Sequence, residues 1–215
     1  MDKRRDYDWY PTPYWCIHRL LERFKLPGGL WLEPCAGDGA IIKAVSEVRD
    51  DFRWNAVEIQ AVAAPLLRPL CPSVVITDFL TWQHPTPLPV GVLTNPPYTL
   101  SLQFVEHCLS MVRRYVIMLM PLTFLASKDR NDFLQANPPS VFPLPNRPSF
   151  THKGSGMTEY GFFAWDKQRI AKKKHYGLVI PLAKTSKAEI AYYKKRQYGA
   201  HQPPLLPSGI FGEKT

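Results

Sequence analysis

The sequence predicts an α/β domain with a mostly parallel sheet, and two patterns carry this expectation. Short apolar runs typical of buried strands alternate along the chain with segments typical of helices. A polar side chain stands at the end of four such runs: Glu33, Glu58, Asp78 and Asn95. Because the carboxyl ends of parallel strands meet at one edge of a sheet, we expect these side chains to surround a ligand.

The first part of the chain predicts a helix, a strand, a glycine-containing turn and a second helix. Thr12-Pro13 offers a capping hydroxyl and a proline suited to a first helical turn. Gly37 and Gly39 let a ligand approach the turn backbone, and the charge of Glu33 favours a cationic amine over a phosphate. The expected elements are a helix at 14–24, a strand at 30–32 and a helix at 41–48.

Three more strands and one helix are expected before residue 95. Glu58 lies about 20 residues after the glycine turn, where an acid holds ribose hydroxyls in doubly wound folds. Asp78 stands near the end of the next strand, and Pro65 interrupts the helix between the two. The expected ranges are strands at 54–59, 74–79 and 90–94 and a helix at 61–70.

The stretch Asn95-Pro96-Pro97-Tyr98 follows the fourth strand and predicts a rigid platform at its carboxyl end. Residues before proline are held extended, and neither proline has an N–H to compete for the carbonyls. The Asn95 amide and a main-chain carbonyl can accept two N–H bonds, while Tyr98 stacks on the ring that carries the amine. The pattern therefore predicts a site for a flat, amine-bearing substrate.

The remaining sequence predicts three helices, three strands and one irregular loop at 145–156. Ser127 is expected to cap the second of these helices. The expected ranges are helices at 102–111, 127–136 and 186–198 and strands at 115–120, 141–144 and 160–165.

The net charge is concentrated in the last part of the chain. Residues 167–215 hold 11 of the 27 Lys and Arg residues and 2 of the 18 acids, which equals the whole net charge of +9. Residues 1–166 hold 16 of each sign and are neutral. Such a basic segment favours a polyanionic partner, although a solvated chain end has the same composition.

Composition argues against membrane, secreted and metal-binding classes. No apolar stretch approaches the roughly 20 residues of a membrane span, and the N-terminus lacks the apolar segment of a secretory signal. The cysteines have no paired spacing for zinc, so we expect no metal site and free thiols in the cytoplasm: Cys16, Cys35, Cys71 and Cys108.

These motifs together resemble those of class I S-adenosylmethionine-dependent amino-methyltransferases, in particular DNA adenine-N6 methyltransferases. The resemblance spans about residues 8–166 and rests on motifs that stand in the family's order: Thr12-Pro13, residues 33–39, Glu58, Asp78-Phe79 and residues 95–98. It implies S-adenosylmethionine as cofactor, with its methionine part surrounded by Thr12, Glu33, Gly37 and Gly39. Glu58 would hold the ribose hydroxyls and Asp78 the adenine amino group, with Phe79 against the adenine ring.

The resemblance also implies a Rossmann-like class I methyltransferase fold, in which a seven-stranded, mostly parallel sheet has an antiparallel last strand. Residues 1–166 would form the S-adenosylmethionine-binding domain and residues 167–215 a basic C-terminal extension. Many relatives carry a large target-recognition domain, for which this extension is too short. We therefore expect DNA contacts from the extension and from the 145–157 loop, in a monomer or weak dimer.

The catalytic residues implied by the resemblance are Asn95, Pro96, Pro97 and Tyr98. An exocyclic amine is a poor nucleophile because its lone pair is delocalised into the ring. Acceptance of both N–H bonds, by Asn95 and the Pro96 carbonyl, would favour the pyramidal nitrogen that can attack a methyl group. A base in double-stranded DNA cannot reach such a site unless it is flipped out.

Three interpretations remain open at this point. The first is a DNA adenine methyltransferase. The second keeps the reaction and changes the substrate to cytosine N4, an RNA adenine or a protein glutamine, since Asn-Pro-Pro-Tyr also occurs in glutamine methyltransferases that act on release factors. The third is a non-catalytic nucleic-acid-binding subunit. The basic extension favours nucleic acid, and the complete set of motifs favours an enzyme.

Overall fold

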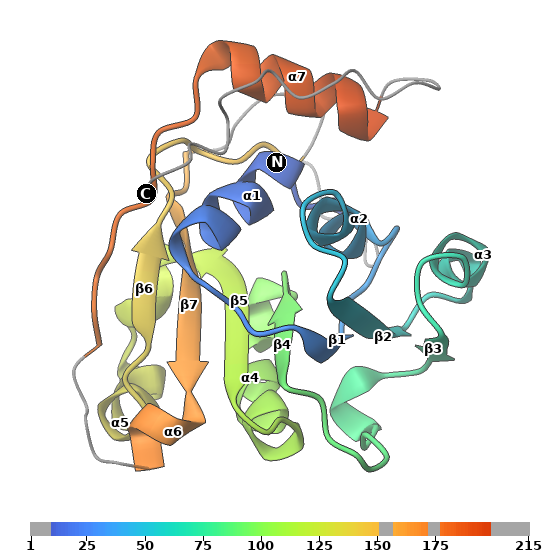
Figure 1. Ribbon diagram of the computed structural model, residues 1–215. Coiled ribbons are helices and arrows are strands. Elements are labelled where there is room, and N and C mark those ends of the chain that lie inside the picture. The colour runs from blue at the N-terminus through green and yellow to red at the C-terminus, as the bar shows by residue number, and fades with distance from the viewer. Residues whose placement is uncertain (1–9, 151–156, 172–176, 199–215) are drawn as a thin grey trace.

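The computed structural model describes residues 10–150, 157–171 and 177–198 of the 215-residue chain. Its centre is a seven-stranded sheet in the order β3-β2-β1-β4-β5-β7-β6 (Figure 1). β7 runs antiparallel to its neighbours β5 and β6, and the other strands are parallel to one another, as expected. The strands are β1 (Gly29–Glu33), β2 (Phe52–Glu58), β3 (Ser73–Ile76), β4 (Gly91–Thr94), β5 (Tyr115–Pro121), β6 (Ser140–Pro143) and β7 (Tyr160–Asp166).

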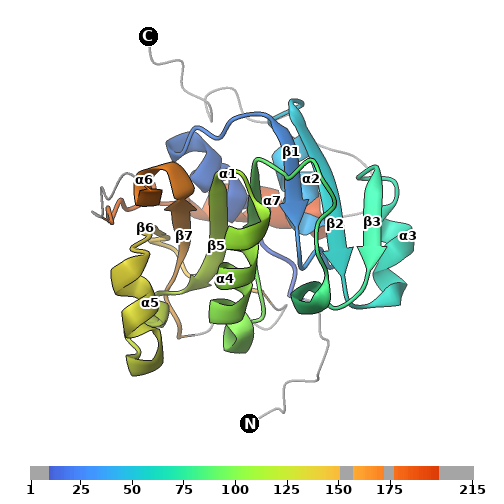
Figure 2. The same ribbon diagram turned by 90° about the horizontal axis from the view of Figure 1, so that it is seen from below.

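Helices cover both faces of this sheet, with α1, α2 and α7 on one side and α4 and α5 on the other (Figure 2). Successive side chains of a strand point to opposite faces, so Trp31 packs into the core under α1 and Leu32 into the core under α4. The helices are α1 (Tyr14–Arg23), α2 (Ala40–Ser46), α3 (Ala64–Leu67), α4 (Ser101–Met111), α5 (Asn131–Ala136), α6 (Lys167–Ala171) and α7 (Lys187–Tyr198).

Two expected helices are shorter than their sequence patterns. The segment at 61–70 is a 3-10 turn (Ala61–Ala63) followed by α3, because Pro65 suits the first turn of a new helix and not a helix interior. The segment at 127–136 likewise begins with a 3-10 turn before α5. The prediction that Ser127 caps it is wrong, since the Ser127 side chain makes no capping hydrogen bond.

Residues 177–198 return to the domain and pack against it. The Val141 N–H of β6 donates to the Leu178 carbonyl at 2.6 Å, which extends the hydrogen bonding of the sheet edge. Farther on, the expected C-terminal helix forms as α7 and buries Tyr193, which is 2% exposed, against α1. The division of the chain at residue 166 stays a prediction, but this part of the extension is built into the domain's core.

The described residues also bear on the excluded classes. All four cysteines are free thiols, and three of them are buried. Within the ranges described, no helix combines the length and apolar character needed to cross a bilayer. Those same ranges hold no cluster of three or more His, Cys, Asp or Glu side chains suited to a metal ion.

Candidate active site

The four polar groups predicted at strand ends lie along the carboxyl edge of the sheet, which faces the top of Figure 1. Glu33 is the last residue of β1 and Glu58 the last residue of β2, and Asn95 directly follows β4. β1 lies between β2 and β4, so the chain connections diverge at this point of the sheet. Ligands of open α/β sheets bind at such a point, outside the carboxyl ends of the strands.

The glycine turn after β1 is tied directly to the end of β2. Gly37 and Gly39 have φ angles of 51° and 80°, a region where a side chain is strained. The Gly37 N–H donates to Glu58 Oε2 at 2.8 Å, and the Gln60 N–H donates to Glu58 Oε1 at 3.0 Å. Glu58 thus holds the turn in place, and each carboxylate oxygen retains a lone pair for a ligand hydroxyl.

Glu33 is a buried carboxyl group at the end of β1. It is 1% exposed, and neither of its oxygens has a partner among the described residues. The buried hydroxyl of neighbouring Thr94 likewise has no hydrogen-bond partner within that set. Burial raises the pKa of Glu33 well above its ordinary value and outweighs the nearby Thr94 hydroxyl and Cys35 backbone, which favour the ionised carboxyl. A ligand that brings N–H donors would satisfy these oxygens.

The Asn95 side chain is held from both ends of its amide. Its Nδ2 group donates to Thr12 Oγ1 at 3.2 Å, and its Oδ1 accepts from the Tyr98 hydroxyl at 3.0 Å. The prediction that Thr12 caps α1 is therefore wrong: α1 has no side-chain cap from the preceding residues, and the Thr12 hydroxyl serves Asn95 instead. The contact brings residues 83 positions apart into one site.

Three aromatic rings form a cluster next to Asn95, which the sequence patterns did not predict. The ring centroids of Tyr98 and Tyr160 are 5.6 Å apart, and Phe150 meets Tyr160 edge-on at 5.1 Å. Tyr160 opens β7 and Phe150 belongs to the loop before it, so only the antiparallel course of β7 brings them beside the end of β4. Together these rings form an apolar wall beside the candidate amine-binding residues.

The segment after β3 is arranged differently from the expected pattern. β3 ends at Ile76, and exposed Asp78 caps the following 3-10 turn by accepting from the Leu80 N–H at 3.0 Å. Phe79 is 3% exposed and packs against Phe104, so it offers almost no ring surface to a ligand in this arrangement. Ile59, which follows Glu58, is 50% exposed and supplies apolar surface at the same edge.

Solved structures that share this fold include several methyltransferases. A Listeria monocytogenes protein proposed to be a class I S-adenosylmethionine-dependent methyltransferase is 12% identical, with a TM-score of 0.55 over 87% of this chain and 68% of that chain. A type I restriction-modification methyltransferase subunit from Streptococcus thermophilus is 17% identical, with a TM-score of 0.57 over 88% of this chain and 53% of that chain. A dimethyladenosine transferase from Plasmodium falciparum is 12% identical, with a TM-score of 0.53 over 73% of this chain and 62% of that chain.

These similarities establish that the chain has the fold of class I methyltransferases. The sequence identities are too low to infer the substrate of this chain from the substrates of those proteins. No protein-family model matches the sequence, and no curated protein is significantly similar to it.

Proposed function

We propose that this protein is an S-adenosylmethionine-dependent methyltransferase that acts on the exocyclic N6 amine of adenine in DNA. The observation that carries the proposal is the position of Asn95: it directly follows β4 on the ligand-binding edge of a class I methyltransferase fold, with its amide oriented by two neighbours. Glu33 and Glu58 stand at the ends of the adjoining strands, where a cofactor of this fold would lie.

The residues of the β1 and β2 ends fit S-adenosylmethionine. The unpaired oxygens of buried Glu33 suit the cationic amine of its methionine part, which would also favour the ionised carboxyl. Glu58 would accept from the ribose hydroxyls while it holds Gly37. Exposed Asp78 would accept a hydrogen bond from the adenine portion, and exposed Ile59 would supply an apolar surface for its ring. When bound, the cofactor supplies an activated sulfonium methyl group.

The chain's own residues would activate and orient the target amine. Asn95 Oδ1 and the Pro96 carbonyl would each accept one N–H bond from it, which favours the pyramidal nitrogen with an available lone pair. Among the described residues no donor is bonded to the Pro96 carbonyl, so it can take this role. In-line placement of the nitrogen then supplies much of the rate enhancement.

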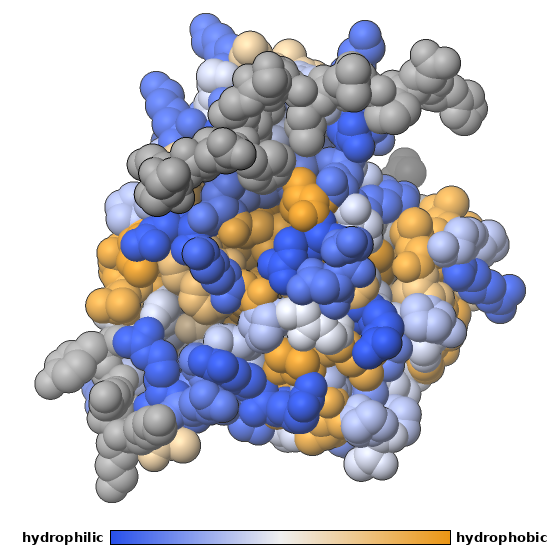
Figure 3. Space-filling view, viewed as in Figure 1, coloured by the Kyte–Doolittle hydropathy of each residue, from blue (hydrophilic) through white to orange (hydrophobic). Residues whose placement is uncertain are grey.

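The Tyr98 ring and the basic surface of α7 favour a nucleic acid as substrate. Tyr98 can stack on a base that has left the duplex, and base–aromatic stacking is worth about 1–3 kcal/mol. α7 lies beyond α1 at the top of Figure 1, and hydrophilic side chains project from that end of the molecule in the same view of Figure 3. Its region exposes four lysines that can reach phosphates: Lys184, Lys187, Lys194 and Lys195.

The test is methyl transfer from labelled S-adenosylmethionine to double-stranded DNA, with mass spectrometry of the released nucleosides. We expect N6-methyladenine from the wild type and a loss of turnover of about 100-fold or more in Asn95→Ala, with cofactor affinity little changed. Equal turnover by the two proteins contradicts the role of Asn95. A methylated product on cytosine, RNA or a glutamine amide contradicts the assignment of DNA adenine as the substrate. The proposed reaction, methyl transfer to an amine, would still stand.

A further inference from the structure

The first turn of α1 lacks the side-chain cap that the sequence predicts at Thr12. The N–H groups of a first helical turn have no partner inside the helix, and a Ser or Thr side chain usually accepts from one of them. Thr12 stands in place for this role, but its hydroxyl accepts from Asn95 Nδ2 instead. The start of α1 therefore depends on a group from elsewhere in the chain.

Gln197, near the end of α7, supplies that group. Its Nε2 donates to the Thr12 carbonyl at 3.0 Å, and its Oε1 accepts from the Tyr14 N–H at 3.4 Å. The side-chain amide thus bonds the backbone on both sides of Pro13, which has no N–H of its own. We call these two hydrogen bonds of Gln197 the clamp. Because the Thr12 hydroxyl holds Asn95, the clamp on the Thr12 backbone also fixes the position of that hydroxyl.

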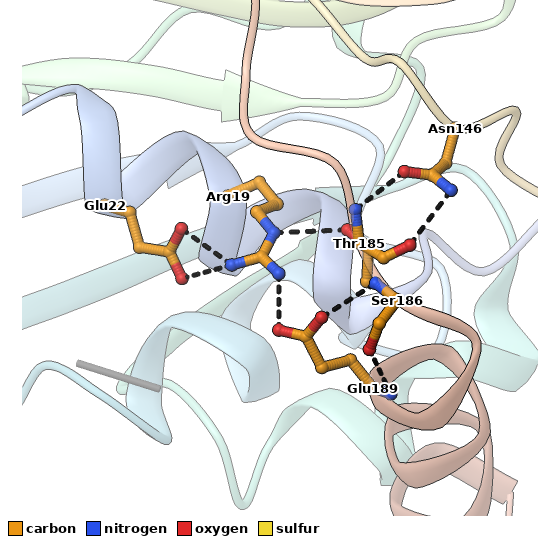
Figure 4. Close-up of polar contacts among 6 residues, drawn as sticks. All are labelled: Arg19, Glu22, Asn146, Thr185, Ser186 and Glu189. Atoms are coloured by element: carbon orange, nitrogen blue, oxygen red, sulfur yellow. Dashed lines mark hydrogen bonds and ion pairs between the residues drawn. The ribbon is translucent and has the colours of Figure 1, made fainter. Parts of the chain in front are cut away.

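α7 itself is anchored firmly enough to place this glutamine. At its start, the Ser186 N–H donates to Glu189 at 2.7 Å and the Glu189 N–H donates back to Ser186 Oγ at 3.2 Å, a reciprocal capping pair. Arg19 of α1 bonds both Glu189 and the Thr185 hydroxyl (Figure 4). The linker before α7 is held in turn by Asn146, whose amide pairs with the Thr185 backbone at 2.7 and 3.1 Å.

The far end of α7 is fixed by a second ion pair. Arg196 pairs with Glu47 just after α2, and the same Glu47 carboxylate lies 3.3 Å from His18 of α1. Arg196 directly precedes Gln197, so this ion pair limits how far the Gln197 backbone can shift along α1. Tyr193 between the two anchors is buried in the core.

We infer that Gln197 is a positioning residue for Asn95, acting through Thr12. The inference rests on the proposed function for its catalytic meaning, because Asn95 is the group that meets the target amine. The C-terminal segment thereby completes the active site in addition to carrying lysines toward the substrate. Loss of the clamp frees residues 12–14, so the Thr12 hydroxyl no longer holds the Asn95 amide at a fixed angle.

A measurement without any substrate tests the contact directly. In protein labelled with ¹⁵N-asparagine, the Asn95 side-chain amide pair is identified by its absence from Asn95→Ala. We expect Gln197→Ala to shift or broaden this pair and leave the Asn146 pair in place. Gln168→Ala is the matched control, since it removes the same atoms from an exposed glutamine on α6. An Asn95 pair that is unchanged in Gln197→Ala overturns the inference, whether or not the protein methylates DNA.

Kinetics then separate positioning from general destabilisation. We expect Gln197→Ala to lower single-turnover methyl transfer by about 10- to 100-fold and leave the Kd for S-adenosylmethionine within about twofold. Gln197→Glu keeps an acceptor for Tyr14 and cannot donate to Thr12, so it should lose a similar factor in a protein that remains folded. In a Thr12→Val background, where Asn95 has already lost its acceptor, Gln197→Ala should have little further effect.

The two claims fail in distinguishable ways. Wild-type protein that transfers no methyl group to any amine contradicts the proposed function, while the asparagine spectrum still decides the contact. Active wild-type protein whose Gln197→Ala variant turns over at full rate overturns the positioning role and leaves the proposed function intact. The double variant gives the same kind of test. If its loss of turnover equals the product of the losses in Thr12→Val and Gln197→Ala, Gln197 does not act through Thr12.

Discussion

Replacement of Glu33 by glutamine tests the electrostatic character of the candidate cofactor site. Because Glu33 is 1% exposed and both its oxygens lack described partners, ionisation of this carboxyl in the free protein is opposed by burial, which raises its pKa. The unfolded chain releases this proton near pH 4.3, whereas the folded protein retains it to higher pH. Protonated Glu33 therefore contributes its full share to the free energy of unfolding below the pKa of the unfolded chain. This contribution is lost as the pH rises toward the raised pKa of Glu33 in the folded protein.

The slope of this loss follows from one retained proton. Within that window the unfolding free energy falls by about 1.4 kcal/mol for each pH unit on account of Glu33. Glutamine has a similar shape and no proton to lose, so Glu33→Gln should be increasingly more stable than the wild type as pH rises. Other shifted groups, such as Glu47 with its lowered pKa, are common to both proteins and cancel in the difference.

The assay is urea unfolding of the cofactor-free wild type and Glu33→Gln at several values from pH 5 to pH 8. The pKa of the buried Cys35 thiol is raised, and an unfolded thiol ionises at about pH 8.5, so cysteine ionisation affects only the top of this range. A stability difference that is constant across the range would show that Glu33 ionises freely in the folded protein. The same variant should lose cofactor affinity in calorimetry, because a neutral amide cannot pair with the cationic amine.

Two further predictions concern the glycine turn and the tyrosine beside Asn95. Gly39→Ala should destabilise the protein by about 1–2 kcal/mol in chemical denaturation, because residue 39 has a φ of 80° and the added Cβ would lie 2.4 Å from Leu70 Cδ1; an unchanged midpoint would mean that the turn relaxes without cost. Tyr98→Phe keeps the ring and removes the hydroxyl bonded to Asn95, so turnover should fall about 2- to 10-fold with base capture unchanged in 2-aminopurine fluorescence. A weakening of base capture as large as the loss of turnover would place the hydroxyl's contact on the substrate instead.

Local signals in the sequence were sufficient for the order of the elements and for part of the site. The apolar run before Asn95 and the two prolines after it depend only on neighbouring residues, and the structure places this asparagine after β4 as expected. Gly37 and Gly39 adopt the positive φ angles that suit glycine at the turn after β1. The expected ranges at 61–70 and 127–136 were less accurate, because turns and short helices there compete at similar local energies.

The sequence by itself determined the alternation of strands and helices, the stiffness of the Asn95 stretch and the acids at the ends of β1 and β2, since each depends on residues close together in the chain. Only the tertiary structure decided that the Thr12 hydroxyl serves Asn95 rather than α1, and that Gln197, 185 residues away, clamps the Thr12 backbone. It also decided that Glu33 is cut off from solvent and that Phe79 faces the core. The packing of helices and strands decides which side chains from distant parts of the sequence come into contact. A local sequence pattern therefore does not predict the distant hydrogen-bond partner of a given side chain.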